Sequence, residues 1–599
     1  MTDKNGPSEI DRLYKKPLTS ERKGPLYNAF SYPTKIDAES IAVFIAAHTN
    51  PGETILDPFG GSGTAGIAAK LCANPTEKMK SIASDLGINP IWGPRNAVII
   101  ELSTIGAFVA EVMTNPPDPG KFAVAANQLI QESSQDLAWM YAAEGPDGKL
   151  GNIRHIIWSE ILTTPCCKAT ISYWDACVKF DPLAIQEVFN CPKCQIQIES
   201  KKCPRKTFKN ISGVGIESSV SRKRLPVFVY GETEGKNWAR KPNAHDLKII
   251  KKIENESPPA GAPSNKLNLG DLYRGGYHTG IERISDLYTS RNFRVISDLW
   301  RRVEMFDSTL KPALKLLILS YNASHSTILS RVVVKKGIQD FVTTGAQSGV
   351  LYVSGLPLEK NIYKGLMRKI TTLSEAFSMI FNKAGEVSVL NASSTSIDLE
   401  DKSIDYVFTD PPFGDFIPYS EVNQINEIWL GQITNQTNEA IVSVSQGKGT
   451  DEYAELMFKI FAEVSRVMKP KAKATVVFHS SKVSVWTALS HALEKNNLQI
   501  EATSILDKTQ VSFKQVVHDG GTRGDAMFLL QKKSKKLSAV NGSKPISVSE
   551  ILADATPVEI SDDKRLYSRF VTSRLENGHK VDISSTEFYK ELQEIKQGH

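Results

Sequence analysis

The stretch that decides the fold is residues 54–66, which read TILDPFGGSGTAG. It consists of a short apolar strand, a glycine-rich turn and the start of a helix that we expect to continue over residues 67–72. Upstream, apolar residues recur at helical spacing over residues 38–47, and Pro51-Gly52 ends that helix. This succession is typical of the first unit of a doubly wound α/β sheet, in which glycines let the backbone approach a ligand at a helix N-terminus. A plain strand-to-helix turn without a ligand is the alternative.

The acid at the end of this strand suggests which ligand the turn binds. Asp57 can hold a cationic amino group, such as the one in the methionine part of S-adenosylmethionine, whereas it would repel a pyrophosphate. The residue types therefore favour S-adenosylmethionine over NAD as the cofactor. The candidate cofactor-binding residues of this stretch are Asp57, Phe59, Gly60, Gly61, Ser62, Gly63 and Thr64.

A second acid is expected to bind the ribose hydroxyls of the cofactor. Glu101 follows the apolar strand 97–100, and Ser103 is placed to cap the helix that runs to Met113. Asp85 is the alternative, because it follows a weaker strand candidate over residues 81–84. We prefer Glu101 on the quality of its strand.

The alternation of strands and helices stops after residue 114 and resumes at residue 385. The later part predicts strands over 387–390, 405–409 and 474–478, helices over 453–468 and 485–496, and closing strands near Ile500 and Met527. Joining both parts gives an α/β fold, a Rossmann-like doubly wound sheet split by a large insertion. The expected organisation is two halves of one catalytic domain at 1–114 and 385–536, an inserted region at 115–384, and a small helical appendage at 537–599.

Residues 410–413 read DPPF and directly follow the apolar strand 405–409. Two prolines remove two backbone donors, so the main chain here offers only carbonyl acceptors. A carboxylate and a carbonyl can accept both hydrogens of an exocyclic amine, and an aromatic ring offers a face for a planar base. The alternative is a proline-stiffened turn with an exposed ring. The candidate catalytic residues are Asp410, Pro411, Pro412 and Phe413, with Asp415 and Tyr419 as candidates for the pocket wall.

Together the two motifs resemble those of the amino-methyltransferases, S-adenosylmethionine enzymes that methylate adenine N6 or cytosine N4. Residues 31–35, which read SYPTK, are similar to the segment that completes the cofactor pocket of that family, and they add Lys35 to the cofactor-binding residues. The segment 466–470 and the strand ending at Phe478-His479 resemble later motifs, so the resemblance covers about residues 25–113 and 385–532.

The resemblance also implies a substrate. Members whose tetrapeptide begins with Asp act mostly on adenine, so Asp410 implies an adenine-N6 enzyme that flips its target base out of duplex DNA. The insert lies where some members carry their target-recognition region. Where many members have an acid that contacts the cofactor adenine, this chain has Asn391-Ala392-Ser393. An RNA adenine methyltransferase and a catalytically silent nucleic-acid-binding subunit are the alternatives.

Six of the seven cysteines lie between Cys166 and Cys203, a clustering that favours metal binding over disulfides in a cytoplasmic chain. Residues 191–194, CPKC, have the spacing of a zinc knuckle, and residues 164–167, TPCC, lie where a second knuckle is expected. Cys166, Cys177 or Cys203 must then supply the fourth sulfur. The segment, about residues 160–205, also resembles the zinc-ribbon insert of some bacterial amino-methyltransferases, and a metal-free ribbon is the alternative to structural zinc. The candidate zinc ligands are Cys166, Cys167, Cys191 and Cys194.

Charge and hydropathy limit the partners. The chain has 599 residues and a net charge of +6, which permits a polyanionic partner such as DNA without requiring one. The basic runs at 201–209 and 222–224, together with Arg291, Arg294, Lys335 and Lys336, are either solvated or in contact with phosphates. The longest apolar stretch, 97–113, is interrupted by Glu101, and the polar N-terminus has no signal-peptide core. We expect a cytoplasmic protein with DNA, and with restriction or defence-system subunits, as partners and no membrane contact.

Overall fold

The computed structural model divides the chain into two compact units, described separately below. The first unit comprises Met1–Pro116, Ala376–Ser420 and Thr434–His599, and the second comprises Pro117–Glu375 and Glu421–Ile433. The sequence does not anticipate the return to the second unit at residue 421. The structure describes residues 9–210, 219–257, 259–327, 330–344, 351–415, 417–508, 524–533, 545–555, 560 and 563–597.

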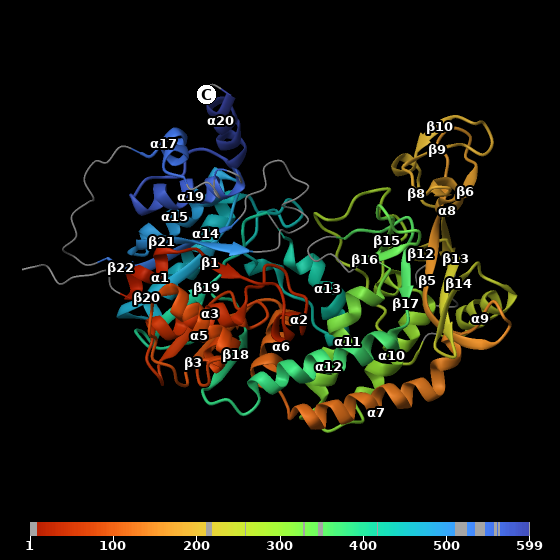
Figure 1. Ribbon diagram of the computed structural model, residues 1–599, viewed down its shortest axis with the longest axis horizontal. Coiled ribbons are helices and arrows are strands. Elements are labelled where there is room, and N and C mark those ends of the chain that lie inside the picture. The colour runs from red at the N-terminus through yellow and green to blue at the C-terminus, as the bar shows by residue number, and fades with distance from the viewer. Residues whose placement is uncertain are drawn as a thin grey trace, which may run out of the picture. The chain divides into compact units, whose positions relative to one another are not determined.

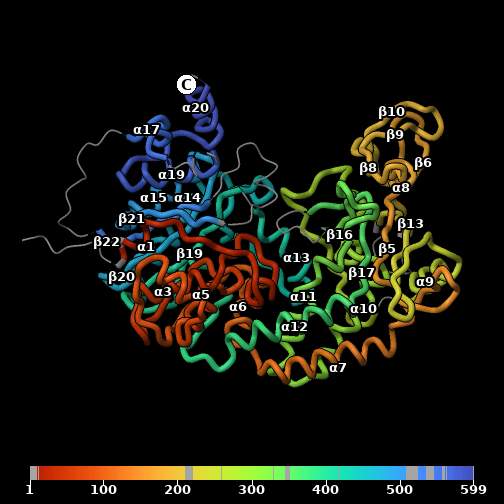
Figure 2. The backbone as a smooth tube through the Cα atoms, viewed as in Figure 1, coloured from red at the N-terminus to blue at the C-terminus, as the bar shows by residue number. Residues whose placement is uncertain are grey.

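The first unit contains one eight-stranded sheet with the order β1-β21-β22-β20-β19-β2-β3-β18. Strands far apart in sequence are neighbours in it: β2 pairs in parallel with β19, and β3 with β18. Figure 2 shows the red N-terminal tube and the cyan to blue later tube together in this unit. Only β22 runs antiparallel, to β20 and β21. A mixed α/β fold with one large sheet is therefore confirmed. The strands are β1 (Leu18–Ser20), β2 (Thr54–Asp57), β3 (Asn96–Glu101), β18 (Val387–Asn391), β19 (Ile404–Thr409), β20 (Met468–Phe478), β21 (Leu498–Lys508) and β22 (Asp525–Lys532).

The helices of this unit begin where local capping dictates. The Ser103 side chain accepts a hydrogen bond from the Gly106 amide at 3.0 Å and caps α6, as its position in the sequence predicts. Thr76 caps α5, which contains Asp85, so the weak strand expected at 81–84 is a helix. The helices are α1 (Glu9–Lys15), α2 (Pro25–Asn28), α3 (Ala38–His48), α4 (Thr64–Leu71), α5 (Glu77–Leu86), α6 (Thr104–Thr114), η4 (Gln436–Asn438), α14 (Thr450–Val467) and α15 (Val483–Lys495).

Three C-terminal helices complete the first unit: α17 (Val548–Ala553), α19 (Asp563–Glu576) and α20 (Ser585–Gln597), drawn in blue in Figure 1. Their apolar residues belong to the hydrophobic core of the sheet. Phe570 of α19 and Phe588 of α20 are fully buried in the same cluster as Phe528 of β22. These helices are therefore a layer of the core and not the small appendage that the sequence suggests.

The second unit is built on an antiparallel sheet with the order β14-β13-β5-β17, in which β4 and β6 also pair with the long strand β5. Helix α12 (Ile362–Ile380) leads back to the first unit, and α13 (Tyr419–Leu430) begins in the first unit and continues in the second. In the described ranges no helix is long and apolar enough to cross a membrane.

The strands of the second unit are β4 (Ala142–Glu144), β5 (Leu150–Thr163), β6 (Thr170–Ser172), β7 (Val178–Phe180), β8 (Leu183–Ile185), β9 (Val188–Asn190), β10 (Gln197–Glu199), β11 (Thr207–Asn210), β12 (Ser219–Arg222), β13 (Arg224–Thr233), β14 (Lys236–Arg240), β15 (Arg331–Val333), β16 (Val342–Thr344) and β17 (Leu358–Lys360). Its other helices are α7 (Pro119–Leu137), η1 (Ala138–Tyr141), α8 (Tyr173–Cys177), η2 (Ser200–Lys202), α9 (Ala244–Asn255), η3 (Ile284–Leu287), α10 (Ser290–Val303) and α11 (Lys311–His325).

Candidate active site

Three acidic residues meet at the carboxyl edge of the large sheet. Asp57 ends β2, Glu101 ends the neighbouring strand β3, and Asp410 follows β19 on the other side of β2. All three line one cavity, whose lining residues belong to the first unit. Because ligands of open α/β sheets bind outside the carboxyl ends of the strands, this cavity is where a ligand is expected.

The glycine turn that follows β2 is attached to the end of β3. The Gly61 amide donates to the Glu101 carboxylate at 2.7 Å, and the Gly60 amide donates to the Ile100 carbonyl at 2.9 Å. Gly63 has a φ of 78°, and a Cβ there would lie 2.7 Å from the Cα of Ala110, so only glycine fits between α4 and α6. Of the predicted residues of the turn, Gly63 does not line the cavity; Phe59, Gly60, Gly61, Ser62 and Thr64 do.

Burial sets the electrostatics of the two strand-end acids. Asp57 accepts hydrogen bonds from the Thr409 hydroxyl at 2.8 Å and the Phe59 amide at 3.1 Å, and burial raises its pKa to about 6. Glu101 also accepts from the Ser103 amide at 2.8 Å, and burial raises its pKa to about 7. Burial removes solvation from both carboxylates, so a cation or hydroxyl donor beside them would stabilise their charged forms.

Residues 32–36 form another wall of the cavity. The Lys35 amine donates to the Leu26 carbonyl at 2.8 Å and the Tyr27 carbonyl at 3.4 Å, so it binds the C-terminal end of α2. Lys35 thereby fixes the wall segment in place. The Tyr32 ring stacks on the Tyr419 ring with centroids 6.2 Å apart, and the Tyr419 and Thr34 hydroxyls lie 3.3 Å apart.

Only two of the four residues of the Asp-Pro-Pro-Phe turn line the cavity. Asp410 and Pro412 line it, whereas Pro411 and Phe413 are not among the lining residues. The Pro412 carbonyl accepts from the Tyr453 hydroxyl at 2.8 Å, a contact that anchors the turn to α14. The Phe413 ring is 7% exposed and makes edge contacts with Phe478 and His479. The ring that the sequence suggests as a stacking face is thus largely part of the core.

Further wall residues come from segments outside the strand pattern. Tyr419 lines the cavity as expected, but Asp415 does not, because it forms an exposed ion pair with Lys482 at 2.6 Å. Ala392, Ser393 and Ser394 line it where the sequence lacks the acid of related enzymes. Buried Glu439, which sequence reasoning missed, accepts from the Ser420 amide at 3.0 Å. No periodic pattern or motif surrounds Glu439, so the sequence gives no signal for it.

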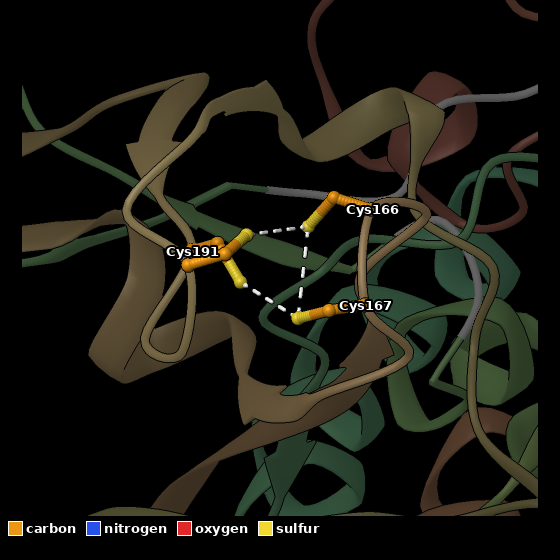
Figure 3. Close-up of side chains that lie close together, drawn as sticks. Cys166, Cys167 and Cys191 are labelled. Carbon is orange, nitrogen blue, oxygen red and sulfur yellow. Dashed lines mark hydrogen bonds between the residues drawn. The ribbon is translucent and has the colours of Figure 1, made fainter.

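The four predicted metal ligands converge in the second unit. The sulfurs of Cys166, Cys167, Cys191 and Cys194 all lie within 4.8 Å of one another, and Figure 3 shows those of the three labelled residues pointing together. The Cys166–Cys194 and Cys167–Cys191 sulfur distances are 3.2 and 3.4 Å. Sulfurs about 2.3 Å from a tetrahedral zinc ion lie roughly 3.8 Å apart, so the cluster fits zinc with a modest expansion.

Cys177 and Cys203, the other two candidates for the fourth sulfur, are buried in the apolar cluster beneath this site. Several of the basic residues are also internal. Arg205, Arg222 and Arg224 surround the buried carboxylate of Glu160, with Arg222 at 3.0 Å and Arg224 at 2.9 Å. Arg291 pairs with buried Glu359. These four side chains are structural, so the phosphate contacts considered for them are not supported.

Lys201 and Lys202 are exposed and both pair with Glu199, at 2.8 and 2.6 Å. Exposed pairs of this kind are weak, so they do not prevent either amine from meeting a phosphate.

Comparisons with solved structures give distant likenesses. A geranyl diphosphate C-methyltransferase from Streptomyces coelicolor A3(2) is 8% identical, with 28% of this chain and 61% of that chain covered and a TM-score of 0.16. A SAM-dependent methyltransferase from Methanosarcina mazei is 12% identical, with 26% and 78% covered and a TM-score of 0.15. The match thus spans about three fifths of the first of these chains. No curated protein matches the chain.

The N-terminal part of the chain has a more specific match. Residues 3–75 match a family model described as DNA methylase, and this segment contains the SYPTK wall, β2 and the glycine turn. The match supports S-adenosylmethionine as the cofactor, as the motifs predict. Over these residues the chain is therefore similar to the DNA methylases.

Proposed function

We propose that the protein is a DNA methyltransferase that transfers a methyl group from S-adenosylmethionine to the N6 amine of adenine. The observation that carries the proposal is that Asp57, Glu101 and Asp410 line one cavity beside the glycine turn. Two of these acids suit a cofactor with a cationic amine and ribose hydroxyls, and the third suits an exocyclic amine.

At the cofactor end, Asp57 would bind the amino group and Glu101 the ribose hydroxyls of S-adenosylmethionine, which supplies an electrophilic methyl group when bound. Glu101 already orders the Gly61 amide, so the same carboxylate shapes the turn and faces the cavity. Phe59, Gly60, Ser62 and Thr64 would complete the binding surface. Lys35 would act indirectly, by holding the 32–36 wall against α2.

At the acceptor end, the Asp410 carboxylate on the cavity wall and the carbonyl of Pro411, next to it in the chain, would each accept one hydrogen bond from the adenine amine. These bonds draw the nitrogen toward tetrahedral geometry and expose its lone pair. The Pro412 carbonyl serves another purpose, since it holds the turn on Tyr453. An amine paired in a duplex cannot reach this position, so the base would be flipped out. Most of the acceleration would come from positioning.

The second unit would recognise the target DNA, and a zinc ion held by Cys166, Cys167, Cys191 and Cys194 would stabilise its ribbon. The four converging sulfurs support the ion. Exposed Lys201 and Lys202 lie in the same segment and could meet phosphates.

The test is transfer of labelled methyl groups from S-adenosylmethionine to unmethylated plasmid DNA, followed by nucleoside analysis. We expect N6-methyladenine. Label on N4-methylcytosine would show that the base assignment is wrong, and label only on RNA would show that the substrate is wrong. No transfer to any nucleic acid, with cofactor binding retained, would favour a silent binding subunit.

A further inference from the structure

A tight turn beside the acceptor cavity carries an exposed apolar side chain at its tip. Ser443 and Lys448 close the turn through two backbone hydrogen bonds of 2.8 and 2.9 Å, and the Gly447 amide donates to the Val444 carbonyl at 3.1 Å. Val444 is 92% exposed, more than any other large apolar side chain in the described part of the chain. At this exposure the Val444 side chain buries almost no apolar area, so it contributes little to the stability of this unit.

The turn is fixed to residues of the cavity wall. The Gln446 amide group donates to the Glu439 carboxylate at 2.7 Å, and the Lys448 amine donates to the Glu439 carbonyl at 2.8 Å. The same Glu439 carboxylate accepts from Ser420, and both Glu439 and Ser420 line the cavity. Just before the turn, the Val442 amide donates to the carbonyl of Gly414, next to Phe413. Val444 is therefore rigidly placed relative to Asp410.

The composition of the turn suits contact with a polyanion. Residues 440–450 contain no acid, and their one lysine is directed toward the protein interior by its bonds to the Gln436 and Glu439 carbonyls. Ser443, Ser445 and Gln446 are small or polar, and a Cβ on Gly447 would meet no atom within 4 Å. The tip itself, residues 443–448, thus carries no acid that would repel a phosphate.

We propose that the 443–448 turn contacts the DNA duplex and that Val444 is the wedge that fills the space left by the flipped base. Apolar side chains inserted between base steps are a known means of stabilising an unstacked duplex. This inference rests on the proposed function, because it needs a flipped base as its reason. The turn would contact the base stack next to the target adenine, and not a partner protein.

The experiment compares Val444→Ala with wild type and with Ile91→Ala, an exposed apolar residue of the same unit that is 61% exposed and lies outside the cavity. The target site is first mapped on plasmid DNA modified by the wild type. Methyl transfer is then measured on two oligonucleotide duplexes, one with thymine and one with an abasic site opposite the target adenine. Flipping costs less in the second duplex, since no pairing has to be broken.

We expect Val444→Ala to lose about tenfold in kcat/KM on the thymine duplex and less than about threefold on the abasic duplex, with Ile91→Ala unchanged on both. With 2-aminopurine at the target position, the fluorescence rise on binding should shrink for Val444→Ala alone. Equal losses on both duplexes, or no loss, would overturn the inference. Inactive wild-type protein would instead contradict the proposed function, so the two failures are distinguishable.

Discussion

Asp57 and Glu101 are buried carboxylates at neighbouring strand ends, and burial makes each harder to ionise than a carboxyl group in water. Burial raises their pKa values to about 6 and about 7. A group with a raised folded-state pKa lets the folded state bind more protons than the unfolded chain, so the free energy of unfolding should fall as pH rises from about 4 to about 7. Binding a cationic amine should have the opposite pH dependence, because it needs the ionised acid.

We therefore predict that affinity for S-adenosylmethionine rises between about pH 5.5 and pH 8, and that binding near pH 6 releases protons. Calorimetry in two buffers of different ionisation enthalpy measures both quantities. Asp57→Asn should weaken binding by about tenfold or more at pH 8 and remove part of the pH dependence. An affinity that does not change with pH would mean that these acids do not face the cofactor's charge.

The chemical step is expected to depend on Asp410. If its carboxylate bonds the amine more strongly as the nitrogen becomes tetrahedral, Asp410→Ala should abolish methyl transfer and leave cofactor affinity nearly unchanged. Single-turnover assays on this variant measure the rate of methyl transfer, and calorimetry measures its affinity for S-adenosylmethionine. Wild-type transfer by Asp410→Ala would refute the acceptor role, and a parallel loss of cofactor binding would show a merely structural one.

Replacing Phe413 with alanine would test both its proposed contact with the base and its packing in the core. Its ring packs on Phe478 and His479, so Phe413→Ala should destabilise the unit by about 3 to 5 kcal/mol, as for other buried phenylalanines. Phe413→Leu keeps most of the volume and separates stability from base capture. Denaturant unfolding followed by transfer assays should find Phe413→Leu folded. A Phe413→Ala protein as stable as the wild type would mean that the ring does not support the core.

At the scale of elements, local chemistry determines what the sequence could predict. The strand-turn-helix around Gly63 and the cap at Ser103 depend on neighbours within a few residues, and both lie where expected. Asp85 is a strand-end candidate in the sequence because the four residues before it, SIAS, suit a strand or a helix, and the cap at Thr76 places them in a helix. Arg222 and Arg224 resembled a phosphate-binding run because their partner, Glu160, lies more than 60 residues away.

The cysteine segment is expected to hold a zinc ion. Protein purified without chelator should contain about one zinc ion per chain by elemental analysis, and the Cys191→Ser, Cys194→Ser double variant should lose it. Cys203→Ala is the matched control, since its sulfur is buried outside the four-sulfur cluster and should leave the zinc content unchanged. A folded, active wild type without metal would mean that the ribbon has lost its ion.

At the scale of the whole molecule, contacts distant in sequence decide the structure. The cavity needs Asp57 and Asp410, which are more than 350 residues apart, and the Thr409 hydroxyl bond to Asp57 joins their strands directly. The strand periodicity predicts that these acids share a sheet edge, but it cannot predict Glu439, which lines the cavity from the segment just after η4. Nor does any local pattern reveal that the last helices cover this sheet.

The C-terminal helices α17, α19 and α20 share the hydrophobic core of the sheet. Phe570 is fully buried among residues of β20, β22 and α15, so removing its ring leaves a cavity in the core that the sheet of the active site shares. Phe570→Ala should lower the free energy of unfolding by about 3 to 5 kcal/mol and reduce cofactor binding in proportion to the unfolded fraction, although the residue does not line the cavity. Ile91→Ala, at an exposed site of the same unit, should change stability by less than about 0.5 kcal/mol. Denaturant unfolding measures the stability of both variants, and calorimetry measures their binding of S-adenosylmethionine. If Phe570→Ala unfolds only the C-terminal helices and the remaining protein binds S-adenosylmethionine normally, those helices form an independent unit and the shared core proposed for them is wrong.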